Sequence, residues 1–196
     1  MTITNGYATL AELKLKMDIP TATTKLDVEM EDVIMGASRA IDNYCNRRFY
    51  QSSVDETFYF TPISGRTCYI DELMTLTTLK TDDDFDGTYE TLWTTTDYNL
   101  VPYNEYPKTC IETTVMGQYW FSPMLQKSVQ VVGKFGFSAA APLDIKLACL
   151  IWASRLQKRR DAILGIAGTT QFGQVKLIDV MDPDVKQLLR PYVRVT

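Results

Sequence analysis

The chain of 196 residues contains no histidine. Histidine is the side chain that titrates nearest to neutral pH, and it is the commonest general base and metal ligand. Its absence excludes every Ser–His and Cys–His pair for nucleophilic catalysis. The sequence also has no GxGxxG and no GxxxxGK[ST] segment, so two common phosphate-binding loops are missing. We therefore expect a protein that is not an enzyme and that needs no cofactor.

Cysteine is scarce, and the four cysteines stand far apart without a CxxC pair: Cys45, Cys68, Cys110 and Cys149. A disulfide framework or a zinc site would require closer spacing, so we expect buried, reduced thiols. No run of about 18 apolar residues is present, which excludes a membrane-spanning helix. The first residues lack the basic and apolar segments of a secretory signal, so we expect folding in a reducing cytoplasm.

Charge is distributed unevenly along a chain whose apolar fraction of 45% can form a core. Residues 1–49 carry a net charge of −1, residues 50–138 carry −7, and residues 139–196 carry +4. A nucleic-acid-binding protein normally has a strong basic excess, which this chain lacks. The asymmetry is compatible with packing between neighbouring copies, and equally with ordinary variation of a solvated surface.

Four segments have the apolar spacing of helices. The first begins at Thr9, which has a capping-box partner at Glu12. The second extends from about Leu26 to Cys45, with apolar residues at steps of three and four. The third begins at Pro142 and reaches about Arg160. The fourth begins at Asp182, an N-cap followed by proline, and ends before Pro191.

Residues 51–137 are rich in threonine, aromatic residues and turns, which predicts short antiparallel strands. The candidate strands are Val54–Phe60, Thr67–Ile70, Leu76–Thr81, Thr88–Trp93, Tyr98–Val101, Cys110–Thr114 and Val129–Phe135. The predicted fold class is therefore α+β. Residues 1–50 and 138–196 form a small bundle of four helices, and residues 51–137 form an inserted β domain resembling a sandwich or a barrel.

The acidic segment from Asp82 to Glu90 has the alternating carboxylates of a calcium loop. Oxygen ligands for Ca²⁺ would come from Asp82, Asp84, Asp86, Thr88 and Glu90. The twelfth position of such a loop is Trp93, so the bidentate glutamate is missing. The alternative is a polar turn between two strands, which we favour.

Every position from Leu147 to Ala153 is apolar, so this helix needs cover on more than one side. A neighbouring subunit is one source of that cover, through Leu147, Ile151 and Trp152, and the β domain is another. Arg159 and Arg160 then make the region basic, and glycines separate further apolar residues at Ile163, Leu164, Ile166 and Phe172. These side chains either contact a partner or fold back onto the chain's own helices.

Three further features stand out, and the first two have two interpretations each. Arg47-Arg48 contacts a partner or DNA, or it neutralises a helix C-terminus. Tyr119-Trp120-Phe121 forms a binding platform, or it packs in the core. The neighbouring carboxylates Asp71-Glu72 sit beside a strand and point to opposite faces, so they do not converge on a substrate. We expect both at solvated positions.

Three stretches together resemble the head–tail connector (adaptor) family of tailed bacteriophages. The first is a helix that ends in Tyr44-Cys45-Asn46-Arg47-Arg48-Phe49. The second begins with Pro142-Leu143-Asp144 and continues to Arg160-Asp161-Ala162. The third is Asp182-Pro183-Asp184-Val185-Lys186-Gln187-Leu188-Leu189-Arg190-Pro191-Tyr192. The resemblance covers about half of the chain, and the large β insertion departs from the shorter members.

The resemblance implies a structural virion protein of the phage neck that assembles in the host cytoplasm. Its copies would form a ring, twelvefold to match the portal protein, between the portal and the stopper or tail-completion protein. DNA would pass through the bore as cargo, and no membrane would be contacted. The same role in a gene transfer agent or a prophage particle, and the role of a stopper, are alternatives. A calcium- or sugar-binding module carried by the β domain is a more distant one.

Overall fold

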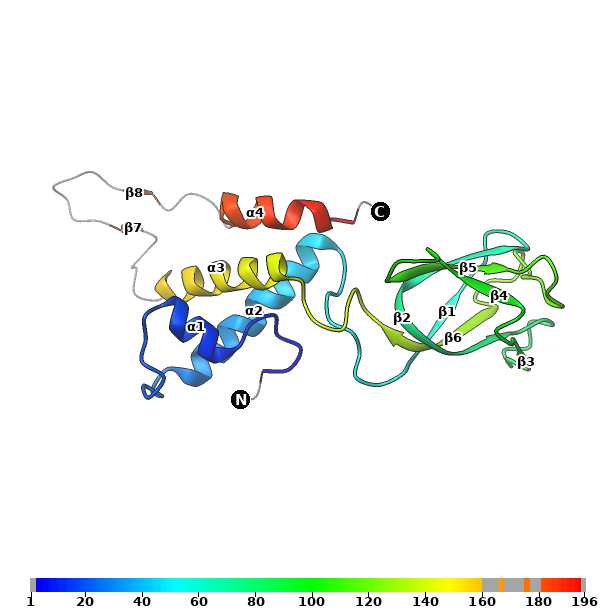
Figure 1. Cartoon of the computed structure of the whole chain (residues 1–196), viewed down its shortest axis with the longest axis horizontal. Coiled ribbons are helices and arrows are strands. Elements are labelled where there is room, and N and C mark those ends of the chain that lie inside the picture. The colour runs from blue at the N-terminus through cyan, green and yellow to red at the C-terminus, as the bar shows by residue number, and fades with distance from the viewer. Residues whose placement is uncertain (1–2, 160–165, 168–174, 177–180, 195–196) are drawn as a thin grey trace. The chain divides into compact units, whose positions relative to one another are not determined.

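The computed structural model describes residues 3–159, 166–167, 175–176 and 181–194 (Figure 1). The chain is an α+β protein, as its sequence predicts, and it divides into two compact units. The helical unit comprises Met1–Arg47 and Ala141–Thr196, and the β unit comprises Arg48–Ala140. The residues of the β unit therefore interrupt the sequence of the helical unit.

The helical unit contains α1 (Leu10–Lys16), α2 (Asp27–Cys45), α3 (Leu143–Arg159), α4 (Pro183–Leu189) and the 3-10 helix η2 (Arg190–Tyr192). The predicted capping box is confirmed, because the Glu12 N–H donates to the Thr9 hydroxyl and the Thr9 N–H donates to the Glu12 carboxylate. The predicted N-cap is confirmed as well, since the Asp182 side chain accepts from the Asp184 N–H. Asn46 ends α2 in the left-handed conformation at φ 50°, where asparagine costs little.

α2 and α3 pack against each other, and α3 also contacts α1 and α4 (Figure 1). The buried side chains of α2 recur at helical spacing and include Met30, Ile34, Ala37, Ile41 and Cys45. Those of α3 include Ile145, Ala148, Cys149, Trp152 and Ala153. The core of the helical unit thus lies between these two helices, and each of them retains a face that points away from the other.

The β unit is one antiparallel sheet with the strand order β1-β6-β2-β5-β4, and β3 pairs with β2 beside this path. Its strands are β1 (Glu56–Phe60), β2 (Thr67–Thr81), β3 (Thr91–Leu92), β4 (Tyr98–Val101), β5 (Lys108–Thr113) and β6 (Val129–Phe135). Two predicted strands have the predicted limits, Tyr98–Val101 and Val129–Phe135. The strand expected at Thr88–Trp93 is reduced to two residues.

The sequence predicts two strands where the structure has the single strand β2. The first part of β2 pairs with β5, and the second part pairs with β6. The register shifts between Leu73 and Thr75 and again between Leu76 and Thr78, so the strand bends without ending. Gly133 permits the bend, because a Cβ there would lie 2.1 Å from the Thr75 carbonyl oxygen. The β unit is therefore built on one curved sheet.

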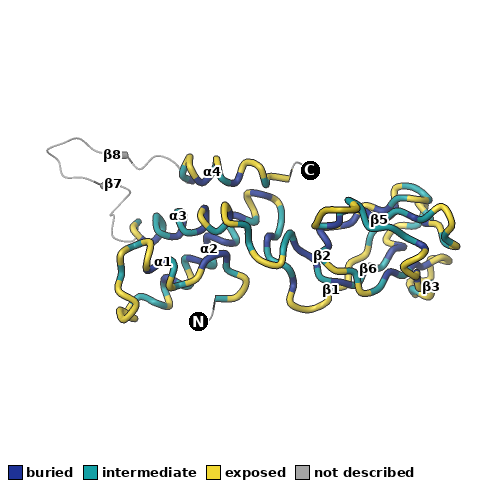
Figure 2. Tube along the Cα trace, viewed as in Figure 1, coloured by how far each residue is buried: buried dark blue, intermediate teal, exposed yellow. Residues whose placement is uncertain are grey.

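The core of the β unit is formed by side chains of β2, β5 and β6, together with two aromatic residues from outside the strands. Its buried members are Cys68, Ile70, Leu73, Leu79, Trp93, Ile111, Phe121, Val129, Val131 and Phe135. Trp93 stacks on Phe121 with ring centroids 4.6 Å apart. Figure 2 shows that the loops around this core are largely exposed.

The chain enters and leaves the β unit along two adjacent segments. Tyr50 forms a parallel bridge with Ser138, and the Phe49 ring lies 5.5 Å from the Phe137 ring. Gly136 makes this approach possible, because its φ is +139° and a Cβ would lie 2.2 Å from the Tyr50 carbonyl oxygen. β1 begins and β6 ends at this end of the unit, since Glu56 pairs with Gly133 and Phe60 with Val129.

Beyond α3 the structure describes two short strands, β7 (Ile166–Ala167) and β8 (Val175–Lys176), which pair antiparallel.

Candidate assembly surface

The face of α3 that points away from α2 carries a row of apolar side chains. Leu143 is 80% exposed and Leu147 is 42% exposed, while Leu150 and Ile151 are half-buried. The spacing of these four residues places them on one side of the helix, and we call them the α3 stripe. Ser154 and the exposed Lys158 continue the same side toward the C-terminus of the helix. The apolar run in the sequence is thus divided between the core and this stripe.

Trp152 lies on the opposite side of α3. It is 8% exposed, and it shares its face with Cys149, whose sulfur lies 3.5 Å from the Ser38 hydroxyl of α2. The chain itself therefore covers most of the indole, and little of it remains for a partner. Of the three helix residues predicted to contact a neighbour, Leu147 and Ile151 lie on the stripe and Trp152 does not.

The remaining predicted interface residues follow α3. Arg159 is its last residue and is half-buried. Arg160, Ile163, Leu164 and Phe172 lie outside the described residues. Ile166 pairs with Lys176 through the backbone of β7. A role for this segment in binding a partner stays a prediction.

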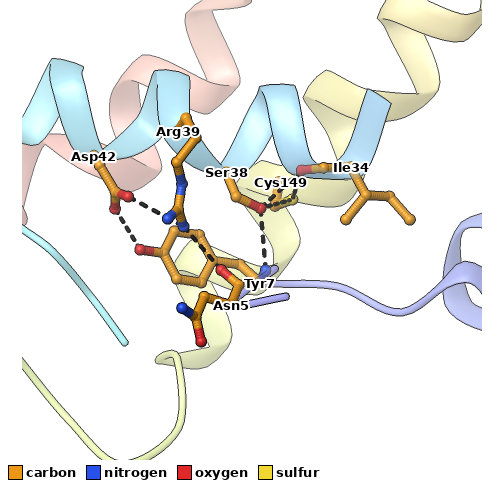
Figure 3. A network of polar contacts seen from close by, with 7 residues as sticks. All are labelled: Asn5, Tyr7, Ile34, Ser38, Arg39, Asp42 and Cys149. Carbon is orange, nitrogen blue, oxygen red and sulfur yellow. Dashed lines mark hydrogen bonds and ion pairs between the residues drawn. The ribbon is translucent and has the colours of Figure 1, made fainter. Parts of the chain in front are cut away.

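A polar network joins the N-terminal segment to α2 and, through Ser38, reaches Cys149 of α3 (Figure 3). The Tyr7 N–H donates to the Ser38 hydroxyl at 3.1 Å, and that hydroxyl donates to the Ile34 carbonyl at 2.8 Å. The Tyr7 hydroxyl donates to the Asp42 carboxylate, which also pairs with Arg39 at 3.2 Å. The N-terminal segment is therefore part of the packed helical unit and is bonded to α2 at both Ser38 and Asp42.

The four cysteines are free and buried, as predicted. Burial raises the pKa of the Cys45 thiol to about 11 and that of Cys68 to about 12. Burial also raises the pKa of Cys110 and Cys149. Thiols with such pKa values hold their protons at neutral pH and are poor nucleophiles and poor metal ligands.

A second exposed apolar surface lies on the loops of the β unit opposite the end where the chain enters. The loop of residues 61–66 and the loop of residues 114–128 are joined by a bond from the Phe121 N–H to the Gly65 carbonyl at 2.9 Å. Their exposed apolar side chains are Ile63 (62%), Val115 (77%), Met116 (94%), Trp120 (50%) and Met124 (93%). We call these residues the loop-end patch. Exposed apolar side chains on two adjoining loops indicate an interaction surface.

The three aromatic residues at positions 119–121 divide between the two readings of their sequence. Phe121 is buried in the core, and Tyr119 packs against that core at its edge. Trp120 belongs to the loop-end patch, and the Arg66 guanidinium lies 4.8 Å from the centroid of its ring. Such a cation–π contact orients an exposed indole without removing it from the surface.

The acidic turn brings three carboxylates together. One oxygen from each of Asp82, Asp84 and Asp86 lies within 4.8 Å of the others, as a cation site requires. Asp82 is nonetheless 3% exposed, and its two oxygens accept the N–H groups of Phe85 at 2.7 Å and Gly87 at 3.0 Å. These bonds close the turn in the manner of an Asx turn without any ion. Thr88 and Glu90 follow at exposed positions, and calcium binding by the five residues stays a prediction.

Two charged groups have roles that the sequence does not reveal. Arg48 pairs with Glu56 at 2.5 Å and donates to the Phe135 carbonyl at 2.9 Å, so it joins the start of the β unit to β1 and β6. Arg48 thus has a structural role within the β unit, and a contact of Arg47-Arg48 with a partner or DNA stays a prediction. Glu72 is 8% exposed, so the expectation that it is solvated was wrong. The bend of β2 carries it inward beside Gly136, whose N–H donates to the Glu72 carbonyl at 2.8 Å.

Comparisons with solved structures identify the architecture. A chain in the neck of an empty GTA particle, computed with C6 symmetry, matches 100% of this chain and 94% of its own length, with a TM-score of 0.64 and 18% identity. A chain in the neck of a native GTA particle, computed with C12 symmetry, has a TM-score of 0.59 and 17% identity over 100% of this chain and 93% of its own length. A chain in the virion of a native gene transfer agent (GTA) particle has a TM-score of 0.61 and 18% identity over 100% of this chain and 94% of its own length.

The chain therefore shares its whole fold, both units included, with chains of these particles. No protein-family model and no curated protein matches the sequence. Among the residues that the structure describes, every helix is too short or too polar to traverse a lipid bilayer.

Proposed function

We propose that this protein is a structural, non-catalytic subunit of the neck of a tailed-phage virion or a gene transfer agent particle. It assembles as a ring between the portal and the stopper or the tail. The single observation that carries the proposal is the full-length similarity to chains from particle necks computed with C6 and C12 symmetry. Sixfold or twelvefold necks are built from rings of identical subunits, and a ring needs every copy to have two complementary faces.

The surfaces of the chain support this proposal. The helical unit presents the α3 stripe and the β unit presents the loop-end patch, so each unit carries exposed apolar side chains that a partner can cover. The four thiols are buried and the chain has no histidine, which leaves the common forms of nucleophilic catalysis without their residues. The acidic net charge of −4 suits a channel through which DNA passes without being held.

Electron microscopy of reconstituted necks tests the proposal. The purified chain is mixed with portal rings of its own particle, and the complexes are classified by symmetry. We expect a ring of additional density on one face of the portal, with sixfold or twelvefold symmetry. A particle population lacking the chain should have filled heads without tails. Portals that stay bare at saturating chain concentration, together with normally tailed particles in the absence of the chain, would refute the neck role.

A further inference from the structure

We infer that the ring is closed by two specific helix faces: the α3 stripe of one copy packs on the outer face of α2 in the next copy. The inference rests on the proposed neck function and identifies the contact between copies. The observations that carry it are the composition of the two outer faces, their placement on opposite sides of the unit, and the charges at their ends.

The α3 stripe is an apolar surface that the described residues cover only in part. Leu143 and Leu147 are 80% and 42% exposed, and Leu150 and Ile151 add half-buried apolar area beside them. Large side chains at positions i, i+4, i+7 and i+8 form the seam by which one helix packs on another. Removing apolar side chains from water stabilises a contact, so a partner helix gains from covering this stripe.

The outer face of α2 suits a close helix–helix contact. It consists of Val28, Asp32, Met35, Gly36, Arg39 and Asn43, which recur at helical spacing away from the buried side of α2. Val28 is 59% exposed. At Gly36 nothing lies within 4 Å of the position that a Cβ would occupy, so a shallow open site interrupts the middle of the face. A small residue at that place lets a second helix approach closely.

The two faces lie on opposite sides of the helical unit. α2 and α3 contact each other through their buried sides, as the approach of Ser38 to Cys149 shows. The α3 stripe and the outer face of α2 therefore point in opposite directions. A contact between two different faces on opposite sides is heterologous, so it propagates from copy to copy and closes into a ring when the rotation permits. A single face that bound its own equivalent would stop at a dimer.

Charge determines the direction of the paired helices. Lys158 is exposed at the C-terminal end of the α3 face, and Asp32 is exposed near the N-terminal end of the α2 face. The two residues meet only when α3 and the neighbouring α2 run antiparallel, which also places opposite helix-dipole ends together. In that alignment Ser154 lies opposite Gly36, because Ser154 precedes Lys158 by four residues and Gly36 follows Asp32 by four residues. Two small residues then face each other where the helices come closest.

Disulfide trapping tests this pairing in the full-length chain. The variant carrying Gly36→Cys and Ser154→Cys places one new thiol on each face, and the native cysteines are buried and do not compete. The control variant carries Leu15→Cys and Ser154→Cys, because Leu15 is 82% exposed on α1 and lies on neither face. Both variants are assembled on portals, oxidised and separated by non-reducing electrophoresis. We expect a ladder of covalent oligomers from the first variant and monomers from the control.

A second pair of variants tests the apolar contact. Leu147→Asp should raise the chain concentration needed for half-maximal ring formation about tenfold or more, as the loss of a central interface residue does. Leu15→Asp introduces the same charge at a more exposed leucine and should leave ring formation unchanged. Both variants should still fold, with at most a small loss in melting temperature, because neither leucine is buried.

The outcomes separate this inference from the proposed function. Rings of the unmodified chain without a ladder from the Gly36/Ser154 variant overturn the α2–α3 contact and leave the neck role intact. Rings that tolerate Leu147→Asp overturn it as well, because another surface must then join the copies. Failure of the unmodified chain to form rings on portals overturns this contact, and together with normally tailed particles in the absence of the chain it removes the neck role as well. A ladder combined with loss of rings in Leu147→Asp establishes the contact.

Discussion

Two single substitutions by alanine in α3 should have very different consequences for the free energy of unfolding. Trp152 is 8% exposed on the side facing the core, whereas Leu147 is 42% exposed on the outer side. Replacing a buried tryptophan by alanine removes its burial and leaves a cavity, at a cost of about 3–5 kcal/mol. We expect Leu147→Ala to cost about 1 kcal/mol, because a fully buried leucine contributes about 1.5–3 kcal/mol and this one is only partly covered.

Urea unfolding and thermal unfolding, each followed by circular dichroism at 222 nm, measure both effects because the helices dominate that signal. One kcal/mol shifts the melting temperature of a domain of about 100 residues by about 4 °C or more, so Trp152→Ala should lower it by about 12 °C or more. The chain has three tryptophans, and Trp93 and Trp120 both lie in the β unit. In the Trp152→Ala variant, fluorescence therefore reports the β unit alone and shows whether the loss is confined to the helical unit.

The reasoning fails if the two variants have equal unfolding free energies. Equal small losses would mean that Trp152 is not covered within the chain, and that it belongs to an interface between copies as its sequence suggests. Equal large losses would mean that the α3 stripe is covered within the chain, which would remove the surface proposed for ring closure.

Three further predictions concern single groups. The Asp97 carboxylate accepts bonds from the Thr94 hydroxyl and N–H and from the Gln118 N–H, which lower its pKa. Its contribution to stability is therefore present above the ordinary aspartate pKa of about 3.9 and is lost as the pH falls through the lowered pKa. The unfolding free energy of Asp97→Asn should therefore depend less on pH between these two pKa values, as acid unfolding would measure. The four buried thiols should react with Ellman's reagent only in denaturant, and rapid reaction of any of them in native protein would contradict their burial. If the acidic turn binds calcium, a chelator should lower the melting temperature and Asp84→Ala should abolish that effect, whereas identical melting curves would leave the closed turn alone.

The helical half of the fold could be predicted from sequence because its signals are local. The second helix was expected from about Leu26 to Cys45 and extends from Asp27 to Cys45. Thr9 and Asp182 form the caps that their spacing indicates. Each of these signals involves residues within four positions of one another, so no knowledge of tertiary contacts is needed.

The curved sheet could not be predicted in the same way. Asp71 and Glu72 suggest a break between two strands, and the structure continues β2 through them with shifts in register. A bulge depends on the strand opposite, here on Gly133, which follows Thr75 by more than fifty residues in the sequence. Such an arrangement leaves no periodic trace in either segment.

The candidate surface could be predicted only in part, for a related reason. From Leu147 to Ala153 every side chain is apolar, so periodicity does not distinguish the side that meets α2 from the outer side. The fold makes that distinction, giving Trp152 to the core and Leu147 to the surface. The exposure of Met116 and Met124 was not predicted from the sequence. The signal for it was that these apolar residues lie between two predicted strands and do not alternate as strand residues do.

The adjacent entry and exit of the β unit have a consequence for how such proteins diversify. Tyr50 and Ser138 are bridged, so the two ends of the segment that follows Phe49 and precedes Ala139 lie side by side. A short loop can join such ends, which is the geometry in which whole segments are gained or lost without disturbing the rest of a fold. Related proteins can then gain or lose this segment while they keep α2 and α3. A chimera that joins Tyr50 to Ser138 through a few glycines and serines would test whether the helical unit folds without it.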